Sequence, residues 1–425
     1  MVLSALNPNL ISIPKNLSDV TTIDYASEVD PQDVGISQKE IDAIWRRVEK
    51  LYGTRVQPGI SLAIRHKGQL VMNRAIGHAR GNAPKNKAYP DAFPDKQLML
   101  PETPVCLFSA SKAITAMLVH QMSKEGLIKL HDPVAEYIPK FGTKGKQFIT
   151  VGEVLAHKAG IPTIEQDEPD PSMLWDWDGV IDILSNAQPR RDARTAQAYH
   201  AITGGFILGE IMRRVTGQSL KDIYKQRLQA PMGADYMTLG IEPQHHDKVA
   251  VNYFTGFEEQ FPVNRIITRA LGGSMRLVTD VSNSNDFLTA DIPAGNVYAN
   301  ALETCNFFQT LLEGGKREGH KRMFKRTTVA RAINEAAPRQ FDRTLMAPLR
   351  TSEGLMLGDS PFGLYGPHTK DAFGHLGFLN IFCWADPSRD ISVSMLTTGK
   401  ALIAPHMPAL AKLLVEINRS FPRAR

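Results

Sequence analysis

The sequence has few cysteines and no long apolar run. Only three of its 425 residues are cysteine (Cys106, Cys305 and Cys383), and none are in CxxC spacing. Such a small, odd number fits reduced thiols in a cytoplasm better than a disulfide framework. No segment approaches the roughly 18 consecutive apolar residues of a membrane span, and residues 1–17 lack the basic and apolar regions of an export signal. The expectation is a cytoplasmic protein without a membrane span.

Excess charge of one sign is also missing. Lys and Arg number 49 against 44 Asp and Glu, so the net charge is only +5. This balance gives no electrostatic basis for binding nucleic acid. The densest basic run, residues 316–326, lacks a neighbouring aromatic stacking platform and is interpreted as a solvated surface, with a partner-binding patch as the alternative. Hydrophobic residues make up 43% of the chain, enough for a large buried core.

Predicted helices and strands are unevenly distributed. A capping box at Ser37 and Glu40 begins a helix, and a hairpin follows over residues 60–76. Strands return at residues 378–385 and 391–397, before a last helix with one apolar face. Between them, with almost no strand, helices are predicted over residues 108–125, 150–160, 180–186, 205–215 and 220–228.

This order of elements predicts an α+β fold. Both chain ends build one antiparallel sheet flanked by terminal helices, and the middle inserts an all-helical domain. The expected boundaries are an extended arm over residues 1–33, a sheet domain over 34–112 and 256–425, and a helical domain over 113–255. The site is expected in the cleft between the two domains.

The usual nucleotide and metal motifs are absent. The chain has no GxGxxG, GxxxxGK[ST] or HExxH, and the pair His245-His246 lacks a spaced third ligand. The GxSxG signature of α/β-hydrolases is missing as well, because residues 272–276 fail it at Arg276. No metal or organic cofactor is therefore expected.

One local pattern carries chemistry. Ser109 and Lys112 lie three residues apart at the start of an apolar helix, so the amine can reach the hydroxyl. Free N–H groups and the positive helix end would favour an oxyanion there, and a partly desolvated lysine can act as a base. The alternative is that Ser109 is only a helix N-cap, since SxxK also arises by chance, as it does at Ser12 to Lys15.

Two further segments support a catalytic interpretation. Tyr199 precedes a glycine-opened helix, where its phenol could relay a proton to the Ser–Lys pair; a packed or surface tyrosine is the alternative. His375 lies between Gly374 and Gly377, just before a predicted strand whose edge could present an N–H to a bound acyl group. Taken alone, a histidine such as His375 is more often structural than catalytic.

Together these segments resemble the serine β-lactamase/penicillin-binding-protein-like superfamily, with its SxxK, tyrosine motif and [KH]xG strand. Within it the chain is most similar to family VIII carboxylesterases, relatives of class C β-lactamases, and Tyr199-His200-Ala201 is especially close to them. The similarity covers most of the chain and includes residues 149–162, 199–217, 231–234, 292–295 and 385–387.

The resemblance implies a β-lactamase/transpeptidase-like fold and a role for each matched residue. Ser109 would be the acylated nucleophile, with Lys112 and Tyr199 in proton transfer. The N–H groups of Ser109 and Phe378 would form the oxyanion hole, and the matched third-motif residues, His375 and Gly377, would shape that wall.

Two departures from the β-lactamase pattern reduce the expectation of efficient β-lactam hydrolysis. Ala201 stands where those enzymes usually keep an asparagine, and His375 stands where they often have lysine. The expected function is hydrolysis of a small-molecule carboxylic ester. The alternatives are an acyltransferase, a weak β-lactamase, an amide hydrolase or a non-catalytic assembly protein.

Two aromatic segments could shape the substrate pocket. The acidic loop of residues 165–178, with Trp175 and Trp177, could line an acyl pocket or be an ordinary surface loop. Phe307 and Phe308 lie in an amphipathic helix, and their spacing favours packing in the core.

Overall fold

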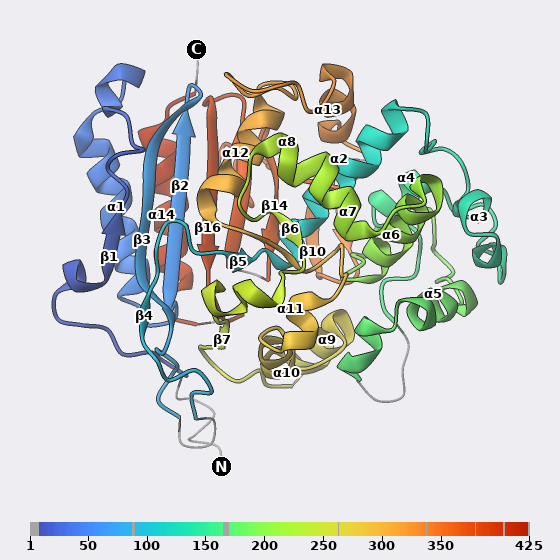
Figure 1. Ribbon diagram of the computed structural model, residues 1–425, viewed down its shortest axis with the longest axis horizontal. Coiled ribbons are helices and arrows are strands. Elements are labelled where there is room, and N and C mark those ends of the chain that lie inside the picture. The colour runs from blue at the N-terminus through green and yellow to red at the C-terminus, as the bar shows by residue number, and fades with distance from the viewer. Residues whose placement is uncertain are drawn as a thin grey trace.

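The computed structural model describes residues 8–86, 90–164, 170–261, 263–336, 338–378, 380–402 and 404–423. Both ends of this chain contribute to one antiparallel sheet (Figure 1). In spatial order its strands are β1 (Thr21–Ile23), β3 (Gln69–Arg80), β2 (Gly59–His66), β16 (Ile391–Thr397), β15 (Ile381–Asp386), β14 (Phe373–Gly377), β11 (Met356–Leu357), β10 (Ala347–Thr351) and β9 (Gln340–Asp342), with β4 (Gln97–Leu98) paired to β3.

Terminal helices cover one face of the sheet. Helix α1 (Gln38–Tyr52) begins at the predicted capping box, where the Glu40 carboxylate accepts the Ser37 N–H at 2.7 Å. It packs with α14 (Met407–Ser420) over β2 and β3, and α12 (Ala301–Leu312) covers the opposite face (Figure 1). The α+β fold class is confirmed. Within the segment predicted as an arm, β1 pairs with β3 and so extends the sheet.

A helical region lies beside the sheet (Figure 1). Its apolar faces and those of the helices around it form one continuous core with the inner face of the sheet. The helices outside the sheet layers are α2 (Ser111–Lys124), α3 (Val134–Tyr137), α4 (Val151–Leu155), α5 (Trp177–Asn186), α6 (Thr203–Thr216), α7 (Leu220–Tyr224), α8 (Ala230–Met232), α9 (Val263–Leu271), α10 (Met275–Val281), α11 (Asn285–Thr289) and α13 (Arg326–Ile333).

Among the described residues, three small sheets of short strands lie outside the main sheet. They are β5 (Val105–Cys106) and β6 (Thr238–Leu239) on either side of β8 (Val297–Ala299), β7 (Tyr253–Phe254) with β17 (Gly399–Lys400), and β12 (Phe362–Gly363) with β13 (Gly366–Pro367). Strands β6 and β7 lie in the stretch where the sequence predicts almost none. Each has two residues, too short for a pattern of alternation to be recognised.

The predicted strand over residues 378–385 is wrong at its start. Strand β14 ends at Gly377, and β15 begins only at Ile381. Phe378 lies in the intervening turn with φ of 37°, a left-handed conformation that a strand does not allow. The side chains of Phe307 and Phe308 are buried and pack in the core, as predicted.

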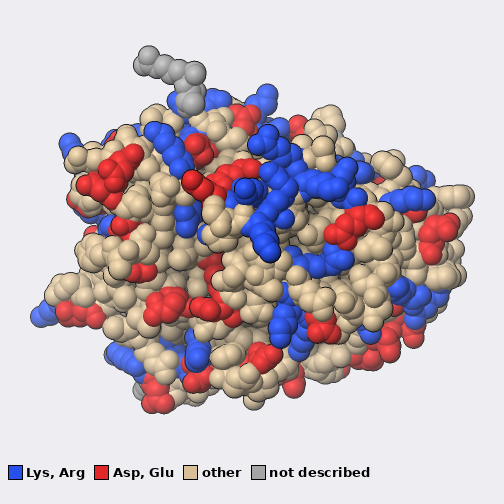
Figure 2. Space-filling model, turned by 45° about the horizontal axis from the view of Figure 1, so that its top comes forward, with Lys and Arg blue, Asp and Glu red and all other residues tan. Residues whose placement is uncertain are grey.

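Basic side chains gather on one face of the molecule (Figure 2). Lys316, Lys321, Arg322, Lys325 and Arg326, from the basic run between α12 and α13, are exposed, as predicted for a solvated surface. Acidic side chains lie among the basic ones on this face (Figure 2). None of the helices in the described residues is both long and apolar enough to cross a membrane.

Candidate active site

Ser109 lies in a single 3₁₀ turn, Phe108–Ala110, that leads directly into α2. Lys112 lies in the first turn of α2, on the same face of the helix. Its Nζ is 3.1 Å from the Ser109 Oγ, so the spacing seen in the sequence brings the two groups within hydrogen-bond distance.

Lys112 is held in an apolar environment. Its side chain is buried, and its Nζ donates a hydrogen bond of 3.0 Å to the backbone oxygen of Ala294. The backbone at Ala294 packs closely against α6 at Gly205, because a Cβ on Gly205 would lie only 2.6 Å from the Ala294 nitrogen. Burial lowers the pKa of Lys112 to about 7. A large share of the lysine is therefore neutral near neutral pH and can accept a proton.

Tyr199 reaches the same point from the loop before α6. Its ring centroid lies 4.9 Å from the Lys112 Nζ. Burial raises the pKa of the Tyr199 phenol, while a side-chain hydrogen bond with Ser109 acts in the opposite direction. Near neutral pH the phenol therefore keeps its proton, which it can donate.

A buried carboxylate fixes the backbone of this loop. The Asp342 Oδ1 accepts the Tyr199 N–H at 3.1 Å, and Asp342 Oδ2 accepts from the Gln197 side chain at 3.2 Å. The same carboxylate accepts the N–H groups of Thr344 and Leu345. Asp342 is 143 residues from Tyr199 in the sequence and belongs to no recognised motif, so nothing in the sequence pointed to it.

Two stacked histidines hold the Tyr199 loop against residues 157–161. Their ring centroids are 5.7 Å apart, and the His200 N–H donates to the His157 Nδ1 at 3.2 Å. His200 Nε2 in turn accepts the Ile161 N–H. Burial lowers the pKa of both, to about 3 for His200, so neither ring carries charge near neutral pH.

The end of β14 closes against the turn that carries Ser109. A Cβ on Gly377 would lie 2.2 Å from the backbone oxygen of Leu107, so only glycine allows this approach. Phe108 and Phe378 both adopt left-handed backbone conformations, with φ of 46° and 37°. Their rings are 4.9 Å apart, so the two backbones that flank the Ser109 hydroxyl are joined by one aromatic contact.

Of the residues predicted for the oxyanion hole and its wall, Ser109 and Phe378 line the adjoining cavity, whereas His375 and Gly377 do not. His375 is buried, its ring centroid is 6.3 Å from that of Tyr199, and its Nδ1 donates to the Leu376 backbone oxygen at 2.7 Å. Burial lowers its pKa to about 3. His375 therefore lies beside Tyr199 as an uncharged imidazole near neutral pH.

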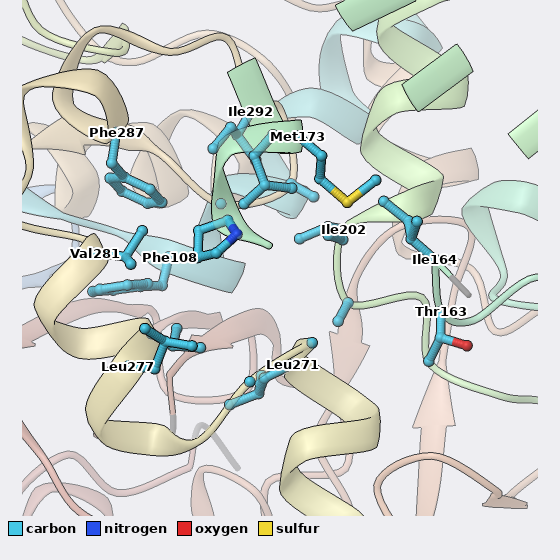
Figure 3. A pocket seen from close by; sticks show the side chains of 18 of the residues that line it. Phe108, Thr163, Ile164, Met173, Ile202, Leu271, Leu277, Val281, Phe287 and Ile292 are labelled. Atoms are coloured by element: carbon cyan, nitrogen blue, oxygen red, sulfur yellow. The ribbon is translucent and has the colours of Figure 1, made fainter. Parts of the chain in front are cut away.

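Ser109 opens into an apolar cavity of about 490 Å³ (Figure 3). In Figure 3, Leu271 at the end of α9 and Leu277 of α10 face Phe108, Val281 and Phe287, and Met173, Ile164 and Ile202 lie further along. Asp170 is the one charged side chain among the described lining residues. The site therefore combines the polar groups of Ser109, Lys112 and Tyr199 with room for an uncharged, apolar group.

The acidic tryptophan-containing loop contributes to this cavity only in part. Residues 165–169 of the prediction lie outside the described residues, whereas Pro171, Met173 and Leu174 line the cavity. Trp175 meets the ring of Phe287 edge-on, with centroids 6.4 Å apart. Trp177 begins α5, and its indole donates to Glu210 at 2.8 Å.

The described residues contain no group of three or more His, Cys, Asp and Glu side chains placed to hold a metal ion. In the pair His245-His246, the second imidazole hydrogen-bonds Asn285 at 3.1 Å. The partner of the His246 imidazole is therefore the neutral amide of Asn285.

Three comparisons with known proteins agree on the kind of molecule. A sequence profile described as Beta-lactamase matches residues 45–415. The Esterase/beta-lactamase LipL of Mycobacterium tuberculosis is 28% identical over 334 residues, which are 74% of this chain and 72% of that protein. A penicillin-binding protein homolog from Caulobacter crescentus superposes with a TM-score of 0.76 at 25% identity over 91% of this chain and 99% of its own. A family VIII carboxylesterase superposes with a TM-score of 0.75 at 24% identity over 90% and 98%.

Proposed function

The chain belongs to the Beta-lactamase family of hydrolases, and on that premise we propose that it is a serine carboxylesterase. Its substrates are uncharged esters with an apolar acyl group, cleaved through an acyl-enzyme on Ser109. The observation that carries this proposal is the contact between the Ser109 hydroxyl and the buried Lys112 amine, at the mouth of an apolar cavity.

In the acylation step, Ser109 Oγ attacks the ester carbonyl carbon and its proton passes to the neutral Lys112 Nζ. The carbonyl oxygen becomes an oxyanion, which the N–H groups of Ser109 and Phe378 stabilise. The bond to the leaving alcohol then breaks, and the Tyr199 phenol supplies the alcohol with a proton that Lys112 replaces. The hydrogen bond between Lys112 Nζ and Ser109 Oγ and the side-chain hydrogen bond between Tyr199 and Ser109 support this relay.

Deacylation reverses these roles with water as the acceptor. The Lys112–Tyr199 pair takes a proton from water, whose oxygen attacks the acyl carbon. The bond to Ser109 Oγ breaks and the serine recovers its proton, so the carboxylic acid leaves and the enzyme is regenerated.

The lining of the cavity favours an ester over a charged substrate. Asp170 is the one acidic lining residue described, and no described lysine or arginine lines the cavity to pair with a substrate carboxylate. His375, at the position where β-lactamases often have lysine, is buried and neutral. LipL, whose name joins esterase and beta-lactamase, makes weak β-lactam turnover the alternative to test.

The proposed function is tested with purified protein and three substrate classes in parallel. These are p-nitrophenyl butyrate, a chromogenic cephalosporin and phenylalanine amide. We expect the ester to be hydrolysed with the highest kcat/KM. Faster turnover of the cephalosporin or the amide would replace the proposal with a β-lactamase or an amidase.

The proposed compartment is the cytoplasm. All three cysteines are unpaired and buried, which fits a reducing environment. Cell fractionation with an antibody against the protein tests this location.

Ester hydrolysis should increase with pH through the pKa of Lys112. Lys112 must be neutral to accept the serine proton, and its pKa is about 7, so kcat/KM should fall about tenfold for each pH unit below it and level off above it. His200 and His375, with pKa values of about 3, stay neutral in this range. The measurement is p-nitrophenyl butyrate hydrolysis, followed at the isosbestic wavelength of p-nitrophenol. A flat profile from about pH 6 to pH 9 would contradict a lysine base.

The size of the acyl group should be limited by Leu277. Its side chain faces Phe108 across the cavity (Figure 3), so a larger group there shortens the available space. In Leu277→Trp we expect kcat/KM for p-nitrophenyl decanoate to fall by about tenfold or more relative to the acetate, equivalent to about 1.4 kcal/mol of lost apolar binding. Leu127→Trp is the matched control, because Leu127 is similarly exposed (39% against 36%) and does not line the cavity. An unchanged decanoate-to-acetate ratio in Leu277→Trp would place the acyl group elsewhere.

A further inference from the structure

A second buried lysine lies close to the site and has no part in the proposed reaction. Lys400 of β17 is completely buried, and its Nζ donates to the Thr397 backbone oxygen at 2.7 Å. The Nζ also lies 4.7 Å from the centroid of the Phe108 ring. Burial disfavours the charged form of this amine and lowers the pKa of Lys400 to about 7, and an aromatic face and a carbonyl oxygen offset part of that cost.

The segment that carries Lys400 supports the Phe108 side of the oxyanion hole. Phe108 immediately precedes Ser109, and its left-handed backbone conformation orients the Ser109 N–H. The Phe108 ring contacts both the Phe378 ring and the Lys400 amine. A ring held in this way restrains the strained backbone to which it is attached.

The same segment also supports the Phe378 side. Asn380 ends the turn that contains Phe378, and its Nδ2 donates to the backbone oxygens of Gly399 and Ala401 at 3.1 and 3.0 Å. The Asn380 backbone oxygen accepts from the Thr397 hydroxyl at 2.9 Å. Residues 397–401 therefore contact both halves of the proposed oxyanion hole.

We propose that Lys400 is a positioning residue of the oxyanion hole. Its amine holds the Phe108 ring, and through that ring it keeps the Ser109 N–H aligned with the N–H of Phe378. This inference rests on the proposed serine chemistry and adds a residue to it. In this proposal residues 397–401 fix the distance between the N–H groups of Ser109 and Phe378.

The chain offers a matched control in Lys146. This lysine is also completely buried, and its Nζ lies 5.3 Å from the Phe141 ring centroid. It donates to three backbone oxygens, of Thr143, Ser185 and Ala187. None of these residues lines the cavity, so Lys146→Met removes a buried ammonium and leaves the site intact.

The test compares Lys400→Met with wild type and Lys146→Met, using a fluorophosphonate that reacts with the serine and p-nitrophenyl butyrate. Because misplacing an oxyanion donor costs activity, we expect Lys400→Met to lower the phosphonylation rate and kcat by about tenfold or more, with KM within about twofold. Lys146→Met should leave both rates unchanged. Lys400→Gln, which keeps a donor for Thr397, serves as a second variant should the methionine protein not fold.

A double-mutant cycle shows whether Lys400 acts through Phe108. In a Phe108→Leu background, Lys400→Met should cause little further loss, since the ring that transmits its effect is gone. Losses that multiply, or a folded Lys400→Met with wild-type rates, would overturn the inference. A wild-type protein that neither hydrolyses the ester nor reacts with the fluorophosphonate would instead overturn the proposed function.

Discussion

Ser109→Ala should lower kcat/KM for p-nitrophenyl butyrate by at least about 10⁴-fold, since loss of a nucleophile removes the covalent pathway. The hydroxyl is the group that the Lys112 amine contacts at 3.1 Å, and alanine leaves that amine without an oxygen to activate. Ser109 is partly exposed at the cavity mouth, so removing one oxygen should leave the fold intact. Mass spectrometry of the wild type quenched during turnover should show an added butyryl group that the variant lacks.

Ser12→Ala is the control for this substitution. Ser12 belongs to the other SxxK match in the chain, which lies before the first strand and away from the cavity lining. It should keep wild-type activity. Equal activity in Ser109→Ala and wild type would remove Ser109 as the nucleophile and with it the mechanism proposed above.

Lys112→Met should lower kcat by about 10³-fold or more, because the base takes part in both acylation and deacylation. Methionine keeps the apolar stem and volume of the buried side chain and removes the amine that contacts Ser109 and Ala294. The residual activity should also lose its rise with pH through about 7, because the titrating group is gone. Pre-steady-state kinetics with p-nitrophenyl butyrate separates the two half-reactions.

Lys15→Met, in the exposed SxxK match, is the matched control and should behave as wild type. A Lys112→Met protein that keeps the wild-type pH profile would show that another group acts as the base. Loss of the acylation burst with unchanged deacylation would restrict Lys112 to the first half-reaction.

The local part of the site could be predicted from the sequence. Three residues of helical spacing bring Lys112 to Ser109, and this needs no knowledge of the rest of the chain. The capping box at Ser37 and Glu40 is equally local, and the hydrogen bond expected from the Ser37 N–H to the Glu40 carboxylate is present at 2.7 Å. The place of Tyr199 before a glycine-opened helix suggested a proton relay, but a separation of 90 residues sets no distance, and the resemblance supplied the pairing with Ser109.

The rest depends on contacts between distant segments. Phe378 adopts a left-handed conformation where β14 approaches Leu107, so the apolar run suggested a strand that begins at Phe378, whereas β15 begins only at Ile381. The Asp342 carboxylate accepts the Tyr199 N–H, and the Ala294 backbone oxygen accepts from Lys112; both contacts join residues that are distant in the sequence. Leu277 and Phe287 line the cavity from α10 and α11, whose apolar residues look like those of any packed helix.

Strand pairing across the whole chain has a consequence for the order of events during synthesis. The central strand β2 pairs with β16, with Ile60 opposite Thr397, so a ribosome must pass nearly the entire sequence before this pairing can form. Until then the edge of β2 lacks its partner, and Ser109 is made long before the turn of Phe378 that completes its surroundings. Pairing between strands that are far apart in the sequence makes folding slow, and an incomplete chain exposes unpaired strand edges that can aggregate. Hydrolytic activity should therefore appear only after β16 has left the ribosome and paired with β2.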